Sequence, residues 1–185
     1  MNNKGTVTLE TERLILRKYS INDAKDMFNN WATNENVTRY LTWTPYTNID
    51  DVKCFLNYCI SQYDNDETYN WCIEFKDNHQ AIGSISVVCL RDDINEASIG
   101  YCLGEDYWRK GIMTEALKKV IDFLFNEVGV NRIEATHDVN NPNSGKVMAK
   151  CGLLYEGTRK QGAVNISGIC DSVIYGLTKE DYKKK

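Results

Sequence analysis

The sequence of 185 residues is poor in metal ligands: it has two histidines, and its seven cysteines include no Cys-x-x-Cys pair. The spacing typical of a zinc site is therefore missing, and we expect no metal. No segment approaches the roughly 20 apolar residues that cross a membrane, and residues 1–6 lack the apolar core of a signal peptide. These absences predict a cytoplasmic protein without a membrane partner, whose cysteines are mostly small buried thiols.

The charge balance and the glycine pattern exclude further classes of ligand. Lysine and arginine total 22 against 26 acidic residues, a net charge of −4, so an extended nucleic-acid surface is not expected. Neither GxxxxGK(S/T) nor GxGxxG occurs, which argues against ATP and NAD. With 42% hydrophobic residues and no repeat or linker, the chain predicts one compact domain, which we place at residues 8–178.

Hydrophobic periodicity predicts an alternation of strands and helices. Alternating or short continuous apolar runs indicate strands, and apolar residues spaced by three and four indicate helices. The clearest helix begins near Met113 and ends at Gly129, and a shorter one ends at Gly152. The predicted strands cover residues 13–17, 69–75, 81–90, 97–103, 132–138, 156–161 and 169–177, and the predicted helices begin near residues 22, 50, 113 and 144. This order predicts an α/β (α+β) domain on a mixed sheet.

One loop has the composition of an anion site. Residues 105–111 join a predicted strand to the longest helix and end in Arg109-Lys110-Gly111. The first amides of a helix have no intrahelical partner and attract anions, and Gly111 lets a phosphate approach the backbone. Two cations at a helix start are easier to understand if an anion sits there. On these residues alone, a phosphate site and a surface turn with two solvated cations are equally open.

Four segments in a fixed order carry a family resemblance. Residues 98–116, SIGYCLGEDYWRKGIMTEA, resemble the acetyl-CoA motif of the GNAT acetyltransferases, in particular the branch of the ribosomal-protein N-terminal alanine and serine acetyltransferases. The other segments are similar to this branch's opening strand, second CoA-facing motif and closing hairpin: TERLILR at 11–17, NPNS at 141–144 with VMAKCGL at 147–153, and YEG at 155–157. The resemblance implies a mixed, mostly antiparallel central sheet of about seven strands, flanked by about four helices.

The resemblance implies acetyl-CoA as the cosubstrate and suggests how it is held. Its pantetheine arm would add to the fourth strand, and its pyrophosphate would bind the amides at residues 109–114. The implied cofactor-binding residues are Tyr101, Leu103, Arg109, Lys110, Gly111, Ile112, Met113, Thr114, Asn141 and Ser144. The loop departs from the usual family pattern at Trp108 and Met113, which leaves backbone amides as the main phosphate contacts. Ser98 stands where the branch often has a glutamate, which removes an obvious general base.

Ser144 and His137 are the candidate catalytic residues. The resemblance implies that the amine attacks the thioester directly, without an acyl-enzyme, and that Ser144 donates a hydrogen bond to the departing sulfur. The alternative role of the same hydroxyl, near Pro142, is to cap a helix. The imidazole of His137 suits a base at neutral pH. An ordinary packed histidine and a carboxylate acting through water are the alternatives.

The acceptor implied by the family is an amine, either a peptide N-terminus or a small molecule such as a polyamine, an amino acid or an antibiotic. An N-terminal amine, with a pKa of about 7.7–8.0, is roughly a tenth neutral at pH 7, which suits an enzyme without an evident strong base. Trp31, Trp43, Tyr46 and Arg159 are candidate residues of the acceptor pocket. A non-catalytic acyl-CoA-binding sensor is the alternative function, and a homodimer is left open.

Overall fold

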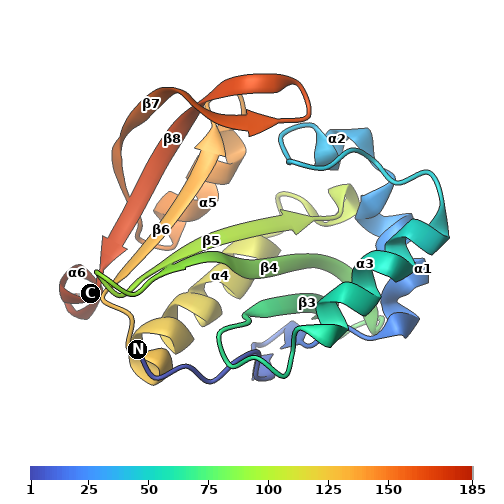
Figure 1. Ribbon diagram of the computed structural model, residues 1–185, viewed down its shortest axis with the longest axis horizontal. Coiled ribbons are helices and arrows are strands. Elements are labelled where there is room, and N and C mark those ends of the chain that lie inside the picture. The colour runs from blue at the N-terminus through green and yellow to red at the C-terminus, as the bar shows by residue number, and fades with distance from the viewer. Residues whose placement is uncertain (185) are drawn as a thin grey trace.

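The computed structural model describes residues 1–184 as an eight-stranded sheet with helices on both faces (Figure 1). The strands are β1 (Leu9–Glu10), β2 (Leu14–Arg17), β3 (Asn70–Phe75), β4 (Gln80–Arg91), β5 (Glu96–Leu103), β6 (Arg132–Asp138), β7 (Leu154–Asn165) and β8 (Gly168–Thr178). Their order is β1-β2-β3-β4-β5-β6-β8-β7, and β5 and β6 are the parallel pair. The mixed, mostly antiparallel sheet is confirmed, with eight strands instead of about seven. The additional strand β1 has two residues, too few for an alternation to reveal.

The four predicted helical regions are all present. The helices are α1 (Ala24–Met27), α2 (Glu35–Thr38), α3 (Ile49–Ser61), α4 (Ile112–Phe123), α5 (Pro142–Lys150) and α6 (Lys179–Lys183). Single 3₁₀ turns, η1 (Ile21–Asp23) and η3 (Glu105–Tyr107), precede α1 and α4, while π-helical turns, η2 (Phe28–Ala32) and η4 (Leu124–Val128), extend the same two helices. The short α2 and α6 were not predicted because one turn carries no periodicity. No helix within residues 1–184 has the length and apolar character needed to span a membrane.

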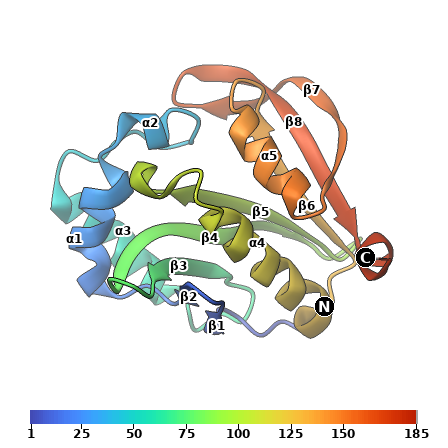
Figure 2. The same ribbon diagram turned by 180° about the vertical axis from the view of Figure 1, so that it is seen from behind.

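The sheet separates two hydrophobic cores. Helices α4 and α5 cover one face, and α1 and α3 cover the other (Figures 1 and 2). Neighbouring residues of β3 contribute to different cores, because successive side chains of a strand point to opposite faces. Trp71 packs in the core beneath α4 with Leu117, whereas Cys72 packs in the core beneath α3 with Leu56. All four side chains are fully buried, so the two helix layers are fixed against the sheet that carries the site.

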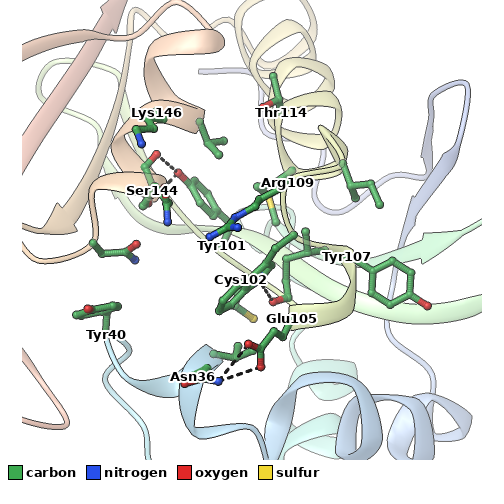
Figure 3. Close-up of a pocket in the computed structure, with 18 of the residues that line it drawn as sticks. Asn36, Tyr40, Tyr101, Cys102, Glu105, Tyr107, Arg109, Thr114, Ser144 and Lys146 are labelled. Atoms are coloured by element: carbon green, nitrogen blue, oxygen red, sulfur yellow. Dashed lines mark hydrogen bonds between the residues drawn. The ribbon is translucent and has the colours of Figure 1, made fainter.

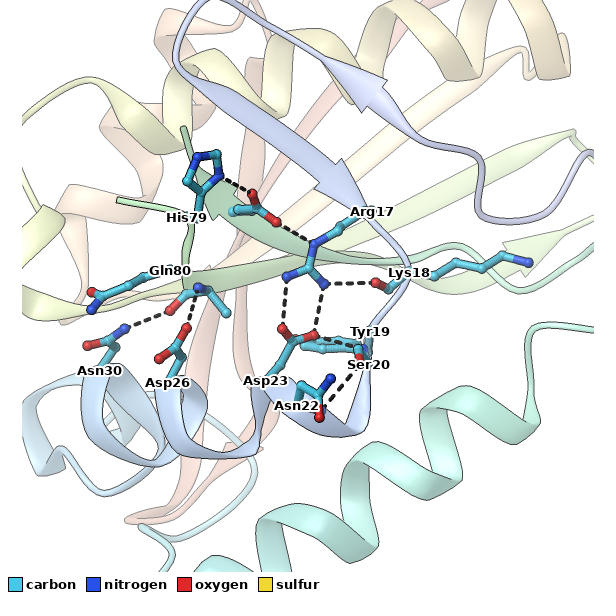
Figure 4. A network of polar contacts seen from close by, with 12 residues as sticks. Arg17, Lys18, Tyr19, Ser20, Asn22, Asp23, Asp26, Asn30, His79 and Gln80 are labelled. Carbon is cyan, nitrogen blue, oxygen red and sulfur yellow. Dashed lines mark hydrogen bonds and ion pairs between the residues drawn. The ribbon is translucent and has the colours of Figure 1, made fainter. Parts of the chain in front are cut away.

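A polar network around Arg17 fixes α1 to the sheet (Figure 4). The guanidinium donates to both carboxylate oxygens of Asp23, at 2.9 and 2.8 Å, and to Glu74 at 2.6 Å. The hydrogen bond with Asp23 is the main reason that the pKa of Arg17 is raised. Further along, Asn30 donates to the carbonyl oxygen of Ala81 on β4 at 2.7 Å. These contacts hold the helical segment that leads into α2, which forms one wall of the site.

Strands β5 and β6 pair over only part of their length. Their parallel register ends at Ile99 and Ala135, and β6 continues to Asp138 paired with β8 alone. Opposite the end of this register, β4 carries a bulge at Val88, which bends and twists the strand locally. Residues 100–103 of β5 therefore present one backbone edge to an opening instead of to a neighbouring strand.

Candidate active site

A cleft of about 710 Å³ lies where β5 and β6 separate, between the starts of α4 and α5 and the segment around α2 (Figure 3). All of the implied cofactor-binding residues except Lys110 line this cleft: Tyr101, Leu103, Arg109, Gly111, Ile112, Met113, Thr114, Asn141 and Ser144. Residues from three separate sequence segments thus meet in one place.

The start of α4 presents free backbone amides to the cleft. Gly111 occupies the N-cap position in a left-handed conformation, with φ 77°, and no side chain caps the helix. The amides of residues 112–114 have no intrahelical partner, and all three residues line the cleft. The preceding loop is fixed by Trp108, whose Nε1 donates to the carbonyl oxygen of Leu103 at 2.7 Å. Uncapped helix starts of this kind attract anions, so this end of α4 is a candidate phosphate site.

Cations surround the same end of the cleft. Arg109, Lys146 and Lys150 line it and are exposed, and within residues 1–184 none of them is in an ion pair. Lys110 instead lies over the ring of Tyr107, with its Nζ 5.7 Å from the ring centre. The sequence analysis missed the two lysines of α5, although a spacing of four residues places them on one helix face.

The side chain of Tyr101 crosses the opening from β5 to α5. Its hydroxyl oxygen lies 3.0 Å from the Oγ of Ser144 and 3.0 Å from the carbonyl oxygen of the same residue. Burial raises the pKa of Tyr101 above its ordinary value, so the phenol keeps its proton. Helix α5 starts at Pro142 with Asn141 as its N-cap, so Ser144 lies inside the first turn. Its hydroxyl contacts Tyr101 instead of serving as the helix cap.

The structure does not bring His137 into the cleft. Its Nδ1 lies 2.7 Å from the carbonyl oxygen of Asp138. Its ring lies 5.8 Å from that of Tyr175, and a Cβ added to Gly145 would lie only 2.5 Å from its Nε2. The ring is therefore enclosed between β8 and α5. This geometry matches a packed, hydrogen-bonded histidine and does not support His137 as the base.

Among residues 1–184, Glu105 is the one acidic residue that lines the cleft. Asn34 Nδ2 donates to its Oε2 at 2.8 Å, and Asn36 Nδ2 donates to both of its carboxylate oxygens at 3.1 Å. These hydrogen bonds, that of Asn34 first, lower the pKa of Glu105, so the group is a carboxylate at neutral pH. Figure 3 shows Glu105, Asn36 and Tyr40 across the cleft from Ser144. The sequence analysis missed this wall because α2 was not predicted.

The residues suggested for an acceptor pocket lie elsewhere. Trp31 is 1% exposed and belongs to the core beneath α1 and α3. Trp43 and Tyr46 stack with ring centres 5.5 Å apart and line a separate shallow depression formed by residues 42–47 and Asp51. Arg159 is on β7 and is not one of the residues 1–184 that line the cleft. Their aromatic and cationic character was a weak signal, because such side chains serve cores and surfaces equally well.

Two cysteines lie at the cleft or contact a residue that lines it. Cys102 lines it with its Sγ 3.2 Å from the Oγ of Ser84, and burial raises the pKa of its thiol. Cys151 Sγ contacts the carbonyl oxygen of Thr114 at 3.5 Å. A thiol must ionise to attack, so a raised pKa makes Cys102 inert at neutral pH. Of the seven cysteines only Cys59 and Cys72 are buried, so the expectation of mostly buried thiols was wrong.

The comparisons with known proteins agree with this geometry. Residues 13–154 match the model of the acetyltransferase (GNAT) domain. An uncharacterised N-acetyltransferase of Bacillus licheniformis is 30% identical over 175 residues, which cover 95% of this chain and 98% of the relative. The chain belongs to the GNAT acetyltransferase family.

Other similar proteins support the GNAT assignment. The ribosomal protein uS5 alanine N-acetyltransferase of Escherichia coli is 24% identical over 189 residues, covering 98% of this chain and 95% of the relative. The crystal structure of the microcin C7 self-immunity acetyltransferase in complex with acetyl-CoA and AMP has a TM-score of 0.81 at 22% identity, covering 91% of this chain and 93% of that one. The expected family and its likeness to the ribosomal branch are confirmed.

As a GNAT acetyltransferase, the protein uses acetyl-CoA as its cosubstrate, and the residues of the cleft fit that molecule. The free amides of α4 and the exposed cations match its phosphates, and the unpaired edge of β5 matches the amide groups of pantetheine. Residues 1–184 contain no group of three His, Cys, Asp or Glu side chains that could hold a metal ion.

Proposed function

We propose that this GNAT acetyltransferase transfers the acetyl group of acetyl-CoA directly to a primary amine, with a protein N-terminus as the first candidate acceptor. The acetyltransferase domain would span residues 8–178. One observation carries the proposal: the hydroxyl groups of Tyr101 and Ser144 meet at 3.0 Å in the opening between β5 and β6, beside the uncapped start of α4. A polar donor pair thus stands where the thioester must lie if the pyrophosphate occupies that helix start.

Acetyl-CoA supplies the acetyl group as a thioester, and the side chains stabilise its departing sulfur. The hydroxyl of Ser144 donates a hydrogen bond to the thiolate as the C–S bond breaks and the N–C bond forms, and the proton that the attacking nitrogen loses passes to solvent. Tyr101 keeps its proton and has the carbonyl oxygen and the Oγ of Ser144 within reach as acceptors; in this mechanism the phenol is the donor of the pair, which leaves the Ser144 proton for the sulfur. A serine is a poor acid, so stabilisation of the developing charge describes the role better than full proton donation. The thiol of Cys102 takes no part.

Glu105 gives the cleft a negative charge on the side from which an amine can enter. Because its pKa is lowered, it is a weak base, and binding the acceptor nitrogen through hydrogen bonds and charge suits it better than strong proton abstraction. Such an enzyme works best on an amine that is partly neutral already. An N-terminal amine meets that condition, with roughly a tenth of it neutral at pH 7, whereas a lysine amine does not. The similar Escherichia coli enzyme carries a ribosomal-protein alanine acceptor in its name.

An acceptor screen tests the proposal. The purified protein is incubated with labelled acetyl-CoA and a panel of N-terminal peptides beginning with alanine or serine, polyamines, amino acids and aminoglycosides. Release of free CoA and transfer of the label are measured in parallel. We expect stoichiometric transfer to N-terminal peptides, with a rate that rises as the peptide amine loses its proton.

The other outcomes separate the alternatives. Transfer to a polyamine or another small amine but to no peptide would replace the N-terminal acceptor by a small-molecule one. Binding of acetyl-CoA without transfer to any amine of the panel would favour a non-catalytic acyl-CoA-binding sensor. The Ser144→Ala variant serves as the control for transfer that depends on the site, and Ser167→Ala, in the turn between β7 and β8, serves as its surface counterpart.

A further inference from the structure

Arg13 lies directly behind the anion-binding loop, although 97 residues separate it from Lys110. Its Nη1 donates to the carbonyl oxygen of Lys110 at 3.0 Å. Its Nε and Nη2 each lie 2.7 Å from Oε2 of Glu115 in the first turn of α4. The backbone amide of Arg13 donates to Oε1 of the same carboxylate at 3.0 Å. One arginine directly before β2 therefore holds both the last peptide of the loop and the first turn of the helix.

The carbonyl group that Arg13 holds decides where the next amide points. The peptide bond between Lys110 and Gly111 is trans, so the carbonyl of Lys110 and the N–H of Gly111 point in opposite directions. Gly111 lines the cleft, whereas Arg13 is not one of the residues 1–184 that do. A Cβ added to Gly111 would lie 3.6 Å from Nη2 of Arg13, so the guanidinium packs against this residue from behind. With the carbonyl turned back to Arg13, the N–H of Gly111 points away from Arg13.

The loop needs an outside contact to keep this shape. Arg109 has a φ of 61° and Gly111 a φ of 77°, so left-handed residues stand on both sides of Lys110. A positive φ is uncommon for a residue with a side chain and persists where the surroundings hold it. Concave backbone turns of this kind gather N–H groups around an anion. The contact from Arg13 to the intervening carbonyl holds the turn without occupying the anion's place.

The ion pair with Glu115 has a second consequence for an anion. Thr11 Oγ1 also donates to this carboxylate, at 2.6 Å. Burial alone would raise the pKa of Glu115, but the hydrogen bonds from Thr11 and Arg13 outweigh it and lower the pKa, so the group stays ionised. A negative charge in the first turn of α4 would repel a pyrophosphate at the same helix start. Arg13 compensates that charge.

We propose that Arg13 is a positioning residue for the pyrophosphate of CoA: it turns the Lys110–Gly111 peptide so that the Gly111 N–H points to the anion, and it neutralises Glu115 beside it. Arg13 acts through these groups and does not itself touch the anion. The inference rests on the proposed function, because it takes the loop as the site of the CoA pyrophosphate.

The positioning role of Arg13 can be tested with two ligands, one with the pyrophosphate and one without it. CoA and pantetheine, which lacks the phosphates, are titrated into the purified full-length protein and its Arg13→Met variant. We expect the variant to bind CoA about tenfold or more weakly, because an oriented amide and a charge balance are lost. Its affinity for pantetheine should change less than about twofold, since a tenfold change would require another lost contact of similar strength. A ¹⁵N–¹H spectrum should show the Gly111 amide signal moving with CoA in the unmodified protein and not in the variant.

Matched variants separate positioning from charge and from folding. Lys76 is a neighbouring cation whose Nζ contacts the carbonyl oxygen of Thr11 at 2.8 Å and which does not reach the loop. Lys76→Met should leave CoA binding unchanged, and Arg13→Lys, which keeps the charge but not the forked donor, should fall between Arg13→Met and the unmodified protein. If Arg13→Met does not fold, as judged by thermal unfolding, Arg13→Lys alone carries the comparison of CoA with pantetheine.

Three results would overturn the inference: equal losses for CoA and pantetheine, an unchanged affinity for CoA in Arg13→Met, or a loss in Lys76→Met as large as that in Arg13→Met. The binding measurement does not need an acceptor. If the protein binds CoA but acetylates no amine, the proposed function is wrong, while the effect of Arg13 on CoA binding can still be measured. Full acetylation with unaffected CoA binding in Arg13→Met would remove the role of Arg13 alone.

Discussion

The hydroxyl of Tyr101 on β5 lies 3.0 Å from the hydroxyl of Ser144 on α5, across 43 residues of sequence. The contact exists because β5 leaves β6 after Ile99, which opens a space that a tyrosine side chain can cross. It places two polar donors together in the opening between β5 and β6. A tyrosine with one proton and a serine with one proton can satisfy each other and still leave one donor for a third atom.

Replacing Tyr101 by phenylalanine tests this hydroxyl pair. Tyr101→Phe should lower kcat about two- to tenfold, which corresponds to the loss of one ordinary hydrogen bond, with little change in the KM for acetyl-CoA. Initial rates at varied acetyl-CoA concentration measure both constants. Tyr155→Phe removes a hydroxyl that contacts Thr158 on the exposed face of β7 and should change neither. An unaltered kcat in Tyr101→Phe would mean that Ser144 needs no partner.

Removing the Ser144 hydroxyl should have a larger effect. Ser144→Ala is expected to lower kcat about 100-fold, the size seen when one donor to a developing charge is lost, while CoA binding stays nearly constant. The combined Ser144→Ala and Tyr101→Phe variant should be little worse than Ser144→Ala, because the two hydroxyls act as one unit. Steady-state rates of the three variants form the cycle. Fully additive losses would show that the two residues act separately.

The backbone conformation at Gly111 provides a test of the phosphate loop. Gly111 and Gly129 have nearly the same left-handed φ, 77° and 81°, at opposite ends of one helical region. Adding a Cβ to a residue in this left-handed conformation costs about 1–2 kcal/mol of folding free energy at either position. Gly111→Ala and Gly129→Ala should therefore lose similar stability in thermal unfolding, while only Gly111→Ala weakens CoA binding. Gly111→Asp, with added bulk and like charge, should weaken it further.

The negative charge of Glu105 should affect the KM for the acceptor amine. Glu105→Gln keeps the shape of the side chain and removes its negative charge. It keeps only part of the contacts to the side-chain amides of Asn34 and Asn36. We expect a raised KM for the amine and an unchanged KM for acetyl-CoA, measured with the best acceptor of the screen. Asp106→Asn removes a neighbouring exposed charge outside the cleft and is the control. If both variants raise the KM for the amine equally, Glu105 acts only through the overall negative charge of this region and makes no direct contact with the acceptor.

The state of Tyr101 predicts how the enzyme behaves in alkali. Its pKa is raised by burial, so the phenol remains protonated at a pH where an ordinary tyrosine, with a pKa of about 10, loses its proton. The hydroxyl pair of the folded protein should thus stay intact beyond about pH 10. Above that value the unfolded chain releases the proton first, so the stability of the fold decreases as pH rises. The absorbance of tyrosinate at alkaline pH, compared between the unmodified protein and Tyr101→Phe, measures this directly.

Local sequence patterns correctly predicted the strand-loop-helix unit around Gly111 and the strand β6. The helix that follows Gly111 is amphipathic, and the strand before it has apolar residues at alternate positions from Ala97 to Leu103. The strand-loop-helix unit and its free amides therefore follow from short-range physics. The boundaries of β6 match the predicted residues 132–138. His137 shows the limit: its position on that strand was correct, but only the packing of Gly145 against its ring shows that it does not reach the cleft.

The sequence by itself determined the family, the order of the elements and the position of the candidate anion loop, because these depend on periodicity and on the chemistry of helix ends within a few residues. The tertiary structure alone decided which side chains meet in the cleft. Tyr101 and Ser144, Arg13 and Lys110, and Asn34 and Glu105 are 43, 97 and 71 residues apart. Each contact depends on where β5 separates from β6 and on how distant elements pack against one sheet, and no short stretch of sequence contains that information.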